Sequence, residues 1–250
     1  MKSGSLQNKT AIITGGNKNL GKETAIDFAE RGANLVLHYH SSADDSASTL
    51  ADELSKKYNV KVALFQGNLI EESAVKGLFD VADKEFGGAD FAINNVGKVL
   101  RKNLEDITTE EYDTMFEVNT KAAFLFLREA AKRVKEDGSV VMLTTSLLGA
   151  YTPGYSVYQG SKSAVHYMIK ALSKETTRRI SFNSVSPGPM DTPFLYGQET
   201  PERVEFFKSQ SPHGRLTEMD DIVPIIRFLC AEGTWITGQN IFANNGFVAP

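Results

Sequence analysis

A tyrosine and a lysine stand four positions apart in the run Tyr158-Gln-Gly-Ser-Lys162, and Ser146 precedes the tyrosine by twelve positions. On a helix, side chains at this spacing lie on one face, one turn from each other. An ammonium group beside a phenol favours the phenolate and so lowers the pKa of tyrosine, which is ordinarily about 10. The pair therefore predicts that Tyr158 donates and accepts a proton near neutral pH. The same spacing also arises by chance on exposed helices, so the surrounding sequence has to decide between the two interpretations.

A glycine-rich segment, Thr14-Gly-Gly-Asn-Lys-Asn-Leu-Gly21, lies between a short apolar strand predicted over 10–14 and a helix predicted over 20–31. A turn of this kind lets the backbone approach a pyrophosphate, which then lies at the positive end of the helix dipole. Asn19 stands where the usual pattern has its middle glycine, and asparagine adopts left-handed backbone angles more readily than most residues. The segment thus indicates a phosphate-binding loop, and a plain tight turn is the alternative.

Short apolar segments and helical segments alternate along the whole chain. The expected strands cover 10–14, 34–39, 60–65, 91–94, 139–144, 180–185 and 240–243. The expected helices cover 20–31, 43–58, 71–86, 109–135, the segment around Tyr158 and Lys162, and 221–230. Thr108 and Glu111 form a capping box at the start of the long helix. Apolar strands separated by helices predict an α/β fold, with a doubly wound parallel sheet of about seven strands and helices on both faces.

The composition is that of an ordinary globular protein: 250 residues, 41% hydrophobic and 23% charged. A net charge of −4 and a pI near 5.7, without a basic patch, argue against a nucleic-acid or anionic-membrane partner. Cys230 is the single cysteine and lies in an apolar run, so we expect a buried side chain, no intrachain disulfide and no cysteine metal cluster. The four histidines have no metal-binding spacing, and we see neither a signal peptide nor a membrane span. We therefore expect a soluble, cytoplasmic, metal-free protein.

Taken in order, the motifs resemble those of the short-chain dehydrogenase/reductase family. They are Thr14-Gly-x-x-x-Asn-x-Gly21, Asn94-Asn-Val-Gly97, Asn119, Ser146, Tyr158-x-x-x-Lys162 and Pro187-Gly-x-x-x-Thr192. The departures from the family pattern are Asn19 for glycine, Val96 for alanine, and Asn68 where an aspartate commonly contacts adenine. The resemblance implies a Rossmann-type fold in a single domain over 1–250, with a flexible N-terminus at 1–8.

The resemblance also implies the reaction, which is hydride transfer between a nicotinamide cofactor and a carbonyl or alcohol. Tyr158 would be the general acid and base, and Lys162 would lower its pKa and bind the nicotinamide ribose. Ser146 would hold the carbonyl oxygen, and Thr145 is a second candidate for this role. The alternative for Ser146 is that it only caps the end of the strand. Asn119, a poor helix former inside a predicted helix, would anchor a water that links Lys162 to solvent.

Cofactor contacts are implied at the glycine loop and at the ends of the strands that follow it. The expected contacts are Gly15, Asn17, Lys18, Asn19, Leu20, Gly21, Tyr39, His40, Ser41, Ser42, Asn68, Leu69, Asn95, Val96, Gly97, Tyr158, Lys162, Pro187, Gly188, Met190 and Thr192. Asn95, which follows the fourth strand, would also order that strand through its side chain.

The end of the second strand favours NADP(H) over NAD(H). An NAD enzyme of this architecture normally has an acidic residue there, and this chain has Tyr39. The next acids, Asp44 and Asp45, fall in the first turn of the following helix, where they serve its dipole. Attraction for a 2′-phosphate is expected from Lys18, from Ser41 and Ser42, and from His40; the alternative is a solvated lysine and helix-capping serines.

A long irregular stretch over 187–215 predicts a substrate lid at 193–215. The substrate site is expected to contain Ser146, Leu147, Leu148, Tyr151, Tyr155 and Tyr158, with Phe194, Leu195, Tyr196, Phe206 and Phe207 from the lid. These side chains favour an apolar or aromatic carbonyl compound, and we find no charged group there that would identify a carboxylate.

Two other functions have to be weighed against an NADP(H)-dependent carbonyl reductase. A catalytically silent NADP-binding regulator would not need the full proton relay, and a sugar-nucleotide epimerase usually needs a longer chain. The resemblance further implies a homotetramer, or a homodimer, that pairs through the helices carrying Asn119 and Tyr158. His166, one turn further along, is expected at such an interface.

Overall fold

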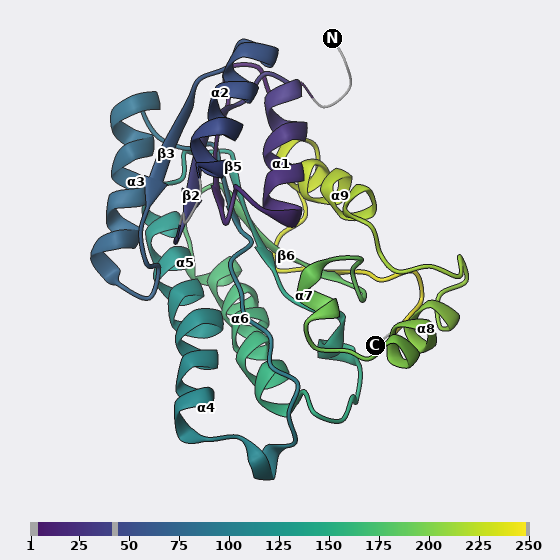
Figure 1. Ribbon diagram of the computed structural model, residues 1–250. Coiled ribbons are helices and arrows are strands. Elements are labelled where there is room, and N and C mark those ends of the chain that lie inside the picture. The colour runs from purple at the N-terminus through teal and green to yellow at the C-terminus, as the bar shows by residue number, and fades with distance from the viewer. Residues whose placement is uncertain (1–4, 42–44, 249–250) are drawn as a thin grey trace.

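The computed structural model describes residues 5–41 and 45–248. They form one seven-stranded sheet in which every strand pair is parallel, in the order β3-β2-β1-β4-β5-β6-β7 (Figure 1). The strands are β1 (Thr10–Thr14), β2 (Asn34–Tyr39), β3 (Val62–Gln66), β4 (Phe91–Asn94), β5 (Gly138–Leu143), β6 (Ile180–Pro187) and β7 (Asn240–Ala243). The order reverses between β1 and β4, which creates the crevice where doubly wound folds bind their ligands. The predicted fold class is confirmed.

Helices cover both faces of this sheet. One face carries α1 (Asn19–Glu30), α2 (Ser46–Tyr58) and α9 (Met219–Ala231). The other face carries α3 (Glu72–Phe86), α5 (Ala122–Arg133) and α6 (Ser156–Glu175). The remaining elements are η1 (Leu104–Asp106), α4 (Thr109–Phe116), η2 (Glu117–Lys121), η3 (Ser146–Gly149), α7 (Pro193–Tyr196) and α8 (Pro201–Ser209). Figure 1 shows α7 and α8 to the side of the sheet, away from α2 and α3.

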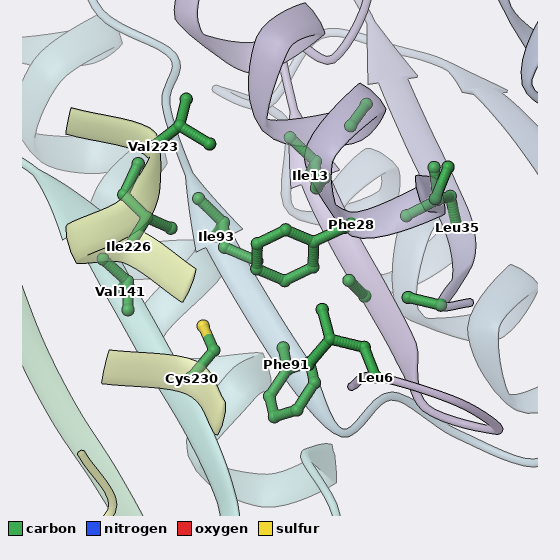
Figure 2. Close-up of a cluster of buried hydrophobic side chains, with 14 of the residues drawn as sticks. Leu6, Ile13, Phe28, Leu35, Phe91, Ile93, Val141, Val223, Ile226 and Cys230 are labelled. Atoms are coloured by element: carbon green, nitrogen blue, oxygen red, sulfur yellow. The ribbon is translucent and has the colours of Figure 1, made fainter. Parts of the chain in front are cut away.

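Two hydrophobic clusters hold these layers together, one on each side of the sheet. Neighbouring residues of β1 point to opposite sides, so Ile13 belongs to one cluster and Ile12 to the other. This is why β1 reads as a continuous apolar run and not as an alternating one. In the first cluster Phe28 of α1 packs edge-on against Phe91 of β4, with ring centroids 6.1 Å apart (Figure 2). Cys230 is buried in the same cluster, as predicted.

Several element boundaries differ from the expectations. Leu6 is buried and its N–H donates to the carbonyl of Arg31, so the flexible N-terminus expected at 1–8 is wrong at this residue; 1–4 lie outside the described residues. The long helix expected over 109–135 is interrupted by η2, a π-helical turn. The irregular stretch over 187–215 contains α7 and α8, each of which begins with a proline in its first turn. No helix within the described ranges is long and apolar enough to cross a membrane.

Candidate active site

The largest group of predicted site residues surrounds one cavity of about 400 Å³ beside the carboxyl ends of β1, β4, β5 and β6. The predicted residues that line it are Gly15, Asn17, Lys18, Asn19, Leu20, His40, Ser41, Asn95, Val96, Gly97, Ser146, Leu147, Tyr155, Tyr158, Lys162, Pro187, Gly188, Met190, Thr192, Phe194, Leu195 and Phe207. The fold therefore brings the glycine loop, the tyrosine–lysine pair and the segment after β6 to a single site.

The glycine loop has the close backbone approach that a pyrophosphate requires. Gly15 has a φ of +60° and Asn19 a φ of +44°, so asparagine does adopt the left-handed angle expected of it. A Cβ at Gly21 would lie 2.1 Å from the carbonyl oxygen of Gly15, which leaves room only for glycine. Gly21 itself does not line the cavity, so its role is to allow the tight turn of the loop and not to contact a ligand. The loop thus fits the phosphates of a dinucleotide at the N-terminus of α1.

The ends of β1 and β4 are fixed to each other by side-chain hydrogen bonds. Thr14 Oγ1 donates to Asn94 Oδ1 over 2.9 Å and accepts the N–H groups of Asn95 and Val96 over 2.9 and 3.2 Å. Asn94 Oδ1 also accepts the N–H of Val96 over 3.1 Å. The asparagine that orders this strand end is therefore Asn94, whereas we expected Asn95 in that role.

His38 is a site residue that the sequence did not indicate. Its Nδ1 accepts the N–H of Gly15 over 3.2 Å, and its Nε2 donates to the carbonyl of Gly67 over 3.0 Å. Burial lowers the pKa of His38 to about 4, so the ring is neutral and joins the glycine loop to the end of β3. The alternation of β2 explains why His38 lines the cavity while its neighbour Tyr39 does not.

Three further residues that we expected to contact the cofactor do not line the cavity. Leu69 is buried in the second hydrophobic cluster, and Asn68 accepts the N–H of Ile70 with its Oδ1 over 3.3 Å; neither lines the cavity. Tyr39 is also outside the lining, and Ser42 falls outside the described residues. Of the residues expected near the 2′-phosphate, Lys18, His40 and Ser41 do line the cavity.

Tyr158 and Lys162 lie on the first turns of α6 and are both buried. Lys162 Nζ donates to the carbonyl of Leu143, at the end of β5, over 3.0 Å. Ser146 is buried at the start of η3, and its Oγ donates to the carbonyl of Ser186 over 3.0 Å. Thr145 makes a side-chain hydrogen bond to Tyr158, so both members of the expected Ser146/Thr145 pair lie at the site.

Burial dominates the proton affinities of this pair. It raises the pKa of Tyr158 to about 12, against the opposite effect of the Thr145 hydrogen bond. It lowers the pKa of Lys162 to about 8. Both shifts have the same cause, because desolvation disfavours the charged form of each group. The expectation that Lys162 holds the tyrosine pKa below its ordinary value is therefore wrong for the protein alone.

Asn119 sits in the π-helical turn η2, behind the cavity wall rather than on it. Its Nδ2 donates to the carbonyl of Lys98 over 2.8 Å and to Ser161 Oγ over 3.0 Å, and its Oδ1 accepts the N–H of Lys98 over 2.8 Å. A Cβ at Gly97 would lie 2.9 Å from Lys162 Nζ and 3.3 Å from Asn119 Oδ1. The side chain of Asn119 thus fixes the segment after β4 against α6, directly beside the lysine.

The substrate end of the cavity only partly matches the expectation. Leu148 does not line it, and Tyr151 points into solvent with its side chain fully exposed; Tyr196 and Phe206 are likewise outside the lining. The lining residues that we did not predict include Val99, Thr152, Gln198, Glu199 and Phe247. Glu199 carries a charge, although we expected no charged group in this part of the site.

Comparison with known proteins gives full-length similarities. The family model described as enoyl-(acyl carrier protein) reductase matches residues 15–248. The chain is 38% identical to the NADPH-dependent aldehyde reductase-like protein, chloroplastic, of Arabidopsis thaliana, over 97% of this chain and 95% of that one. It is 37% identical to NADPH-dependent aldehyde reductase 2, chloroplastic, of the same plant, over 96% and 94% of the two chains.

Among solved structures, a Burkholderia cenocepacia crystal structure named as a dehydrogenase with bound NADP superposes with a TM-score of 0.94. It is 43% identical to this chain, and the match covers 100% of this chain and 97% of that one.

Proposed function

The chain belongs to the short-chain dehydrogenase/reductase family, and we propose that it is an NADP(H)-dependent reductase that converts an aldehyde or ketone to an alcohol. The observation that carries the proposal is that Ser146, Tyr158 and Lys162 line the same cavity as the glycine loop. Around that loop, the described lining residues include Lys18, His40 and Ser41 but no carboxylate. A 2′-phosphate therefore meets a cation and no like charge. The relatives named as NADPH-dependent and the relative with bound NADP support the same cofactor.

When bound, NADPH supplies the hydride that adds to the carbonyl carbon. Tyr158 donates its phenolic proton to the carbonyl oxygen, so that hydride and proton together give the alcohol. A pKa of about 12 keeps Tyr158 protonated at neutral pH, which is the state that a general acid needs in the direction of reduction. Ser146 holds the carbonyl oxygen after its hydroxyl turns away from the carbonyl of Ser186, to which it donates in the protein alone.

Lys162 holds the tyrosine end of the site in place and supplies positive charge near the reacting oxygen. Its pKa of about 8 leaves the ammonium form in excess at pH 7. The lysine is held from one side by the carbonyl of Leu143 and is confined on the other by the backbone of Gly97. Asn119 acts indirectly, because it fixes the Lys98 peptide next to Gly97.

We further infer that residues 193–215 act as the substrate lid. The segment contributes Phe194, Leu195, Gln198, Glu199 and Phe207 to the cavity lining. Lids of this kind exclude water and complete the binding site when substrate is present.

Assembly into a homotetramer, or a homodimer, is the last part of the proposal. Tyr112 on α4 and Phe124 on α5 are 44% and 45% exposed, and Tyr167 on α6, next to His166, is 67% exposed. Exposed aromatic side chains on neighbouring helices are typical of a protein–protein interface. Light scattering after gel filtration should give two or four times the 27.4 kDa of one chain, and a mass of 27.4 kDa would contradict the inference.

The function is tested by following NADPH oxidation with a panel of aldehydes, ketones and one enoyl thioester. We expect turnover of carbonyl compounds by the wild type. We expect a loss of roughly two to four orders of magnitude in Tyr158→Phe, which keeps the ring but cannot donate the proton. NADPH affinity should be unchanged within about threefold in the variant, because the ring and its packing remain. A silent NADP-binding protein would bind NADPH without turning over any of the panel, and a Tyr158→Phe variant with more than a tenth of wild-type turnover would refute the assignment.

A further inference from the structure

The glycine loop is held from behind by one histidine of β2. The ring atom Nδ1 of His38 accepts the N–H of Gly15 over 3.2 Å, and the backbone carbonyl of His38 accepts the N–H of Gly16 over 2.9 Å. These two N–H groups belong to the peptide groups on either side of Gly15, whose φ is +60°. A single residue therefore fixes both peptide planes around the left-handed position of the loop.

The other ring nitrogen ties the histidine to the end of β3. Nε2 lies 3.0 Å from the carbonyl oxygen of Gly67, and the ring lies near that of Phe65, with centroids 6.4 Å apart. A backbone N–H can only donate and a carbonyl can only accept, so Nδ1 must be unprotonated and Nε2 must carry the proton. Burial lowers the pKa of His38 to about 4, which keeps the ring in this neutral form at neutral pH.

The ring acts on the loop and not on a ligand, because His38 is only 1% exposed. The position of the loop is in turn tied to the first turn of α1. A Cβ at Gly21 would lie 2.1 Å from the carbonyl oxygen of Gly15, so that carbonyl packs directly against the start of the helix. The N–H groups of this first turn have no partner within the helix and are the ones that bind a phosphate. The histidine thus orients the peptides that adjoin the phosphate-binding turn.

We propose that His38 is a positioning residue for the cofactor: its neutral imidazole holds the glycine loop in the conformation that binds the phosphates of NADPH, and so sets the affinity for a cofactor that it does not touch. Without Nδ1 the N–H of Gly15 is a buried donor without an acceptor, and its peptide turns to find another one. The binding conformation is then only a fraction of the population, and the Kd for NADPH rises by the inverse of that fraction. This inference rests on the proposed NADP(H)-dependent function, and its test separates the two.

The test uses His38→Leu and His38→Asn, a matched pair with the same branching at Cγ. In the asparagine variant Oδ1 takes the place of Nδ1 and can accept the N–H of Gly15, whereas leucine has a methyl group there. Both side chains are too short to reach Gly67, and each variant leaves one buried donor unpaired, so both should lose stability to urea by similar amounts. A change that only followed stability would therefore be equal in the two variants.

Affinity should instead separate them. By titration calorimetry we expect the Kd for NADPH to rise about thirtyfold in His38→Leu and to stay within about threefold of the wild type in His38→Asn. With NADPH saturating, kcat should stay within about threefold of the wild type in both, because the ring does not touch the reacting groups. Without cofactor, amide hydrogen exchange over 12–20 should be at least about tenfold faster in His38→Leu than in the other two proteins.

The tautomer of the wild type is a measurement that needs no variant to lose affinity. A long-range ¹H–¹⁵N spectrum at pH 7 should show His38 as a neutral ring protonated on Nε2. The chain has four histidines, and the signals of His38 are those that are absent from His38→Asn.

The outcomes distinguish the two proposals. An unchanged Kd in His38→Leu, an equal rise in both variants, or a wild-type ring that is protonated on Nδ1 overturns the positioning inference alone. If His38→Leu does not fold, the tautomer of the wild type and the Kd of His38→Asn decide, and a rise of more than about tenfold in the latter overturns the inference. A wild type that binds NADPH but reduces none of the carbonyl panel overturns the reductase function, while the affinities still test the role of His38. A wild type that does not bind NADPH overturns both.

Discussion

Replacement of Lys162 by methionine should stabilise the protein while it abolishes the reaction. The ammonium group is buried, and its pKa falls from 10.5 to about 8 because the charged form is desolvated. Each pKa unit corresponds to about 1.4 kcal/mol, so holding the cation in the folded state costs about 3 kcal/mol at pH 7. Methionine has a similar length and no charge, but it leaves the carbonyl of Leu143 without its donor, which costs about 1 kcal/mol. We therefore expect Lys162→Met to be more stable by about 2 kcal/mol at pH 7.

The pH dependence of this gain follows from the direction of the shift. Below the folded-state pKa of about 8, the lysine is charged in both states and the folded protein carries the whole desolvation cost. Between that value and 10.5 the folded protein releases the proton first, so the cost shrinks, and above 10.5 both states are neutral and the cost is absent. The stability of the wild type relative to the variant should thus rise with pH over this window.

The assay is thermal or urea unfolding of both proteins at pH 7 and near pH 10.5, at one protein concentration, with NADPH oxidation in parallel. At pH 7 we expect a Tm higher by about 4–8 °C in the variant, since 1 kcal/mol corresponds to about 2–4 °C for a chain of this length. Turnover should fall as far as in Tyr158→Phe, with weaker NADPH binding as well. Lys170→Met, on the exposed side of the same helix, is the control and should change neither stability nor activity appreciably. A Lys162→Met protein that is less stable at pH 7, or whose stability difference does not vary with pH, would refute the reasoning.

Three further predictions concern the loop, the cofactor and the lid. Gly97→Ala should lower kcat by at least about tenfold, because the new Cβ would lie 2.9 Å from Lys162 Nζ. Gly160→Ala is the control and should leave turnover unchanged, because the nearest neighbour of its Cβ would be 3.7 Å away. Equal rates in the two variants would contradict this prediction. Lys18→Ala should raise KM for NADPH by about tenfold and leave KM for NADH within twofold, and a wild-type preference for NADH would count against the proposed cofactor. Amide hydrogen exchange over 194–211 should slow when NADPH and an unreactive substrate analogue bind together, and identical exchange with and without them would argue against a lid.

The sheet and the catalytic helix were predictable because their signals are local. The inner strands β1, β4 and β5 are fully buried and β1 reads as an apolar run, whereas the edge strands β3 and β7 are half-buried. The glycine loop marks the turn after β1, and the Tyr158–Lys162 spacing marks the helix that follows β5. The left-handed angle at Asn19 was also readable, since asparagine tolerates it. Seven strands and the site at their carboxyl ends follow from these signals alone.

What the sequence could not provide depends on long-range packing. Successive side chains of β2 point to opposite faces of the sheet, so that His38 lines the cavity and Tyr39 does not. Residue types alone do not show which of the two faces the cavity, because a shift of one residue exchanges the faces. Glu199 looks like a solvent-exposed lid residue until Tyr155 and the arginines are folded around it. The raised pKa of Tyr158 was missed for the same reason, since desolvation depends on how deeply a group is buried.

The π-helical turn at Asn119 sets a limit on how far this protein can be made more regular. A π turn holds one residue more than an α turn, so it interrupts the helix between α4 and α5 and loses its regular hydrogen bonding. Deleting one residue within Glu117–Lys121 would restore a continuous helix, but it would rotate the asparagine by about 100° away from Lys98 and Ser161. The same deletion would turn α5 relative to α4 and move buried residues such as Phe126 out of the second hydrophobic cluster, so we expect the shortened protein to lose stability as well as turnover. The irregular turn therefore places Asn119 beside Lys98 and Ser161 while α5 keeps its buried face on the sheet.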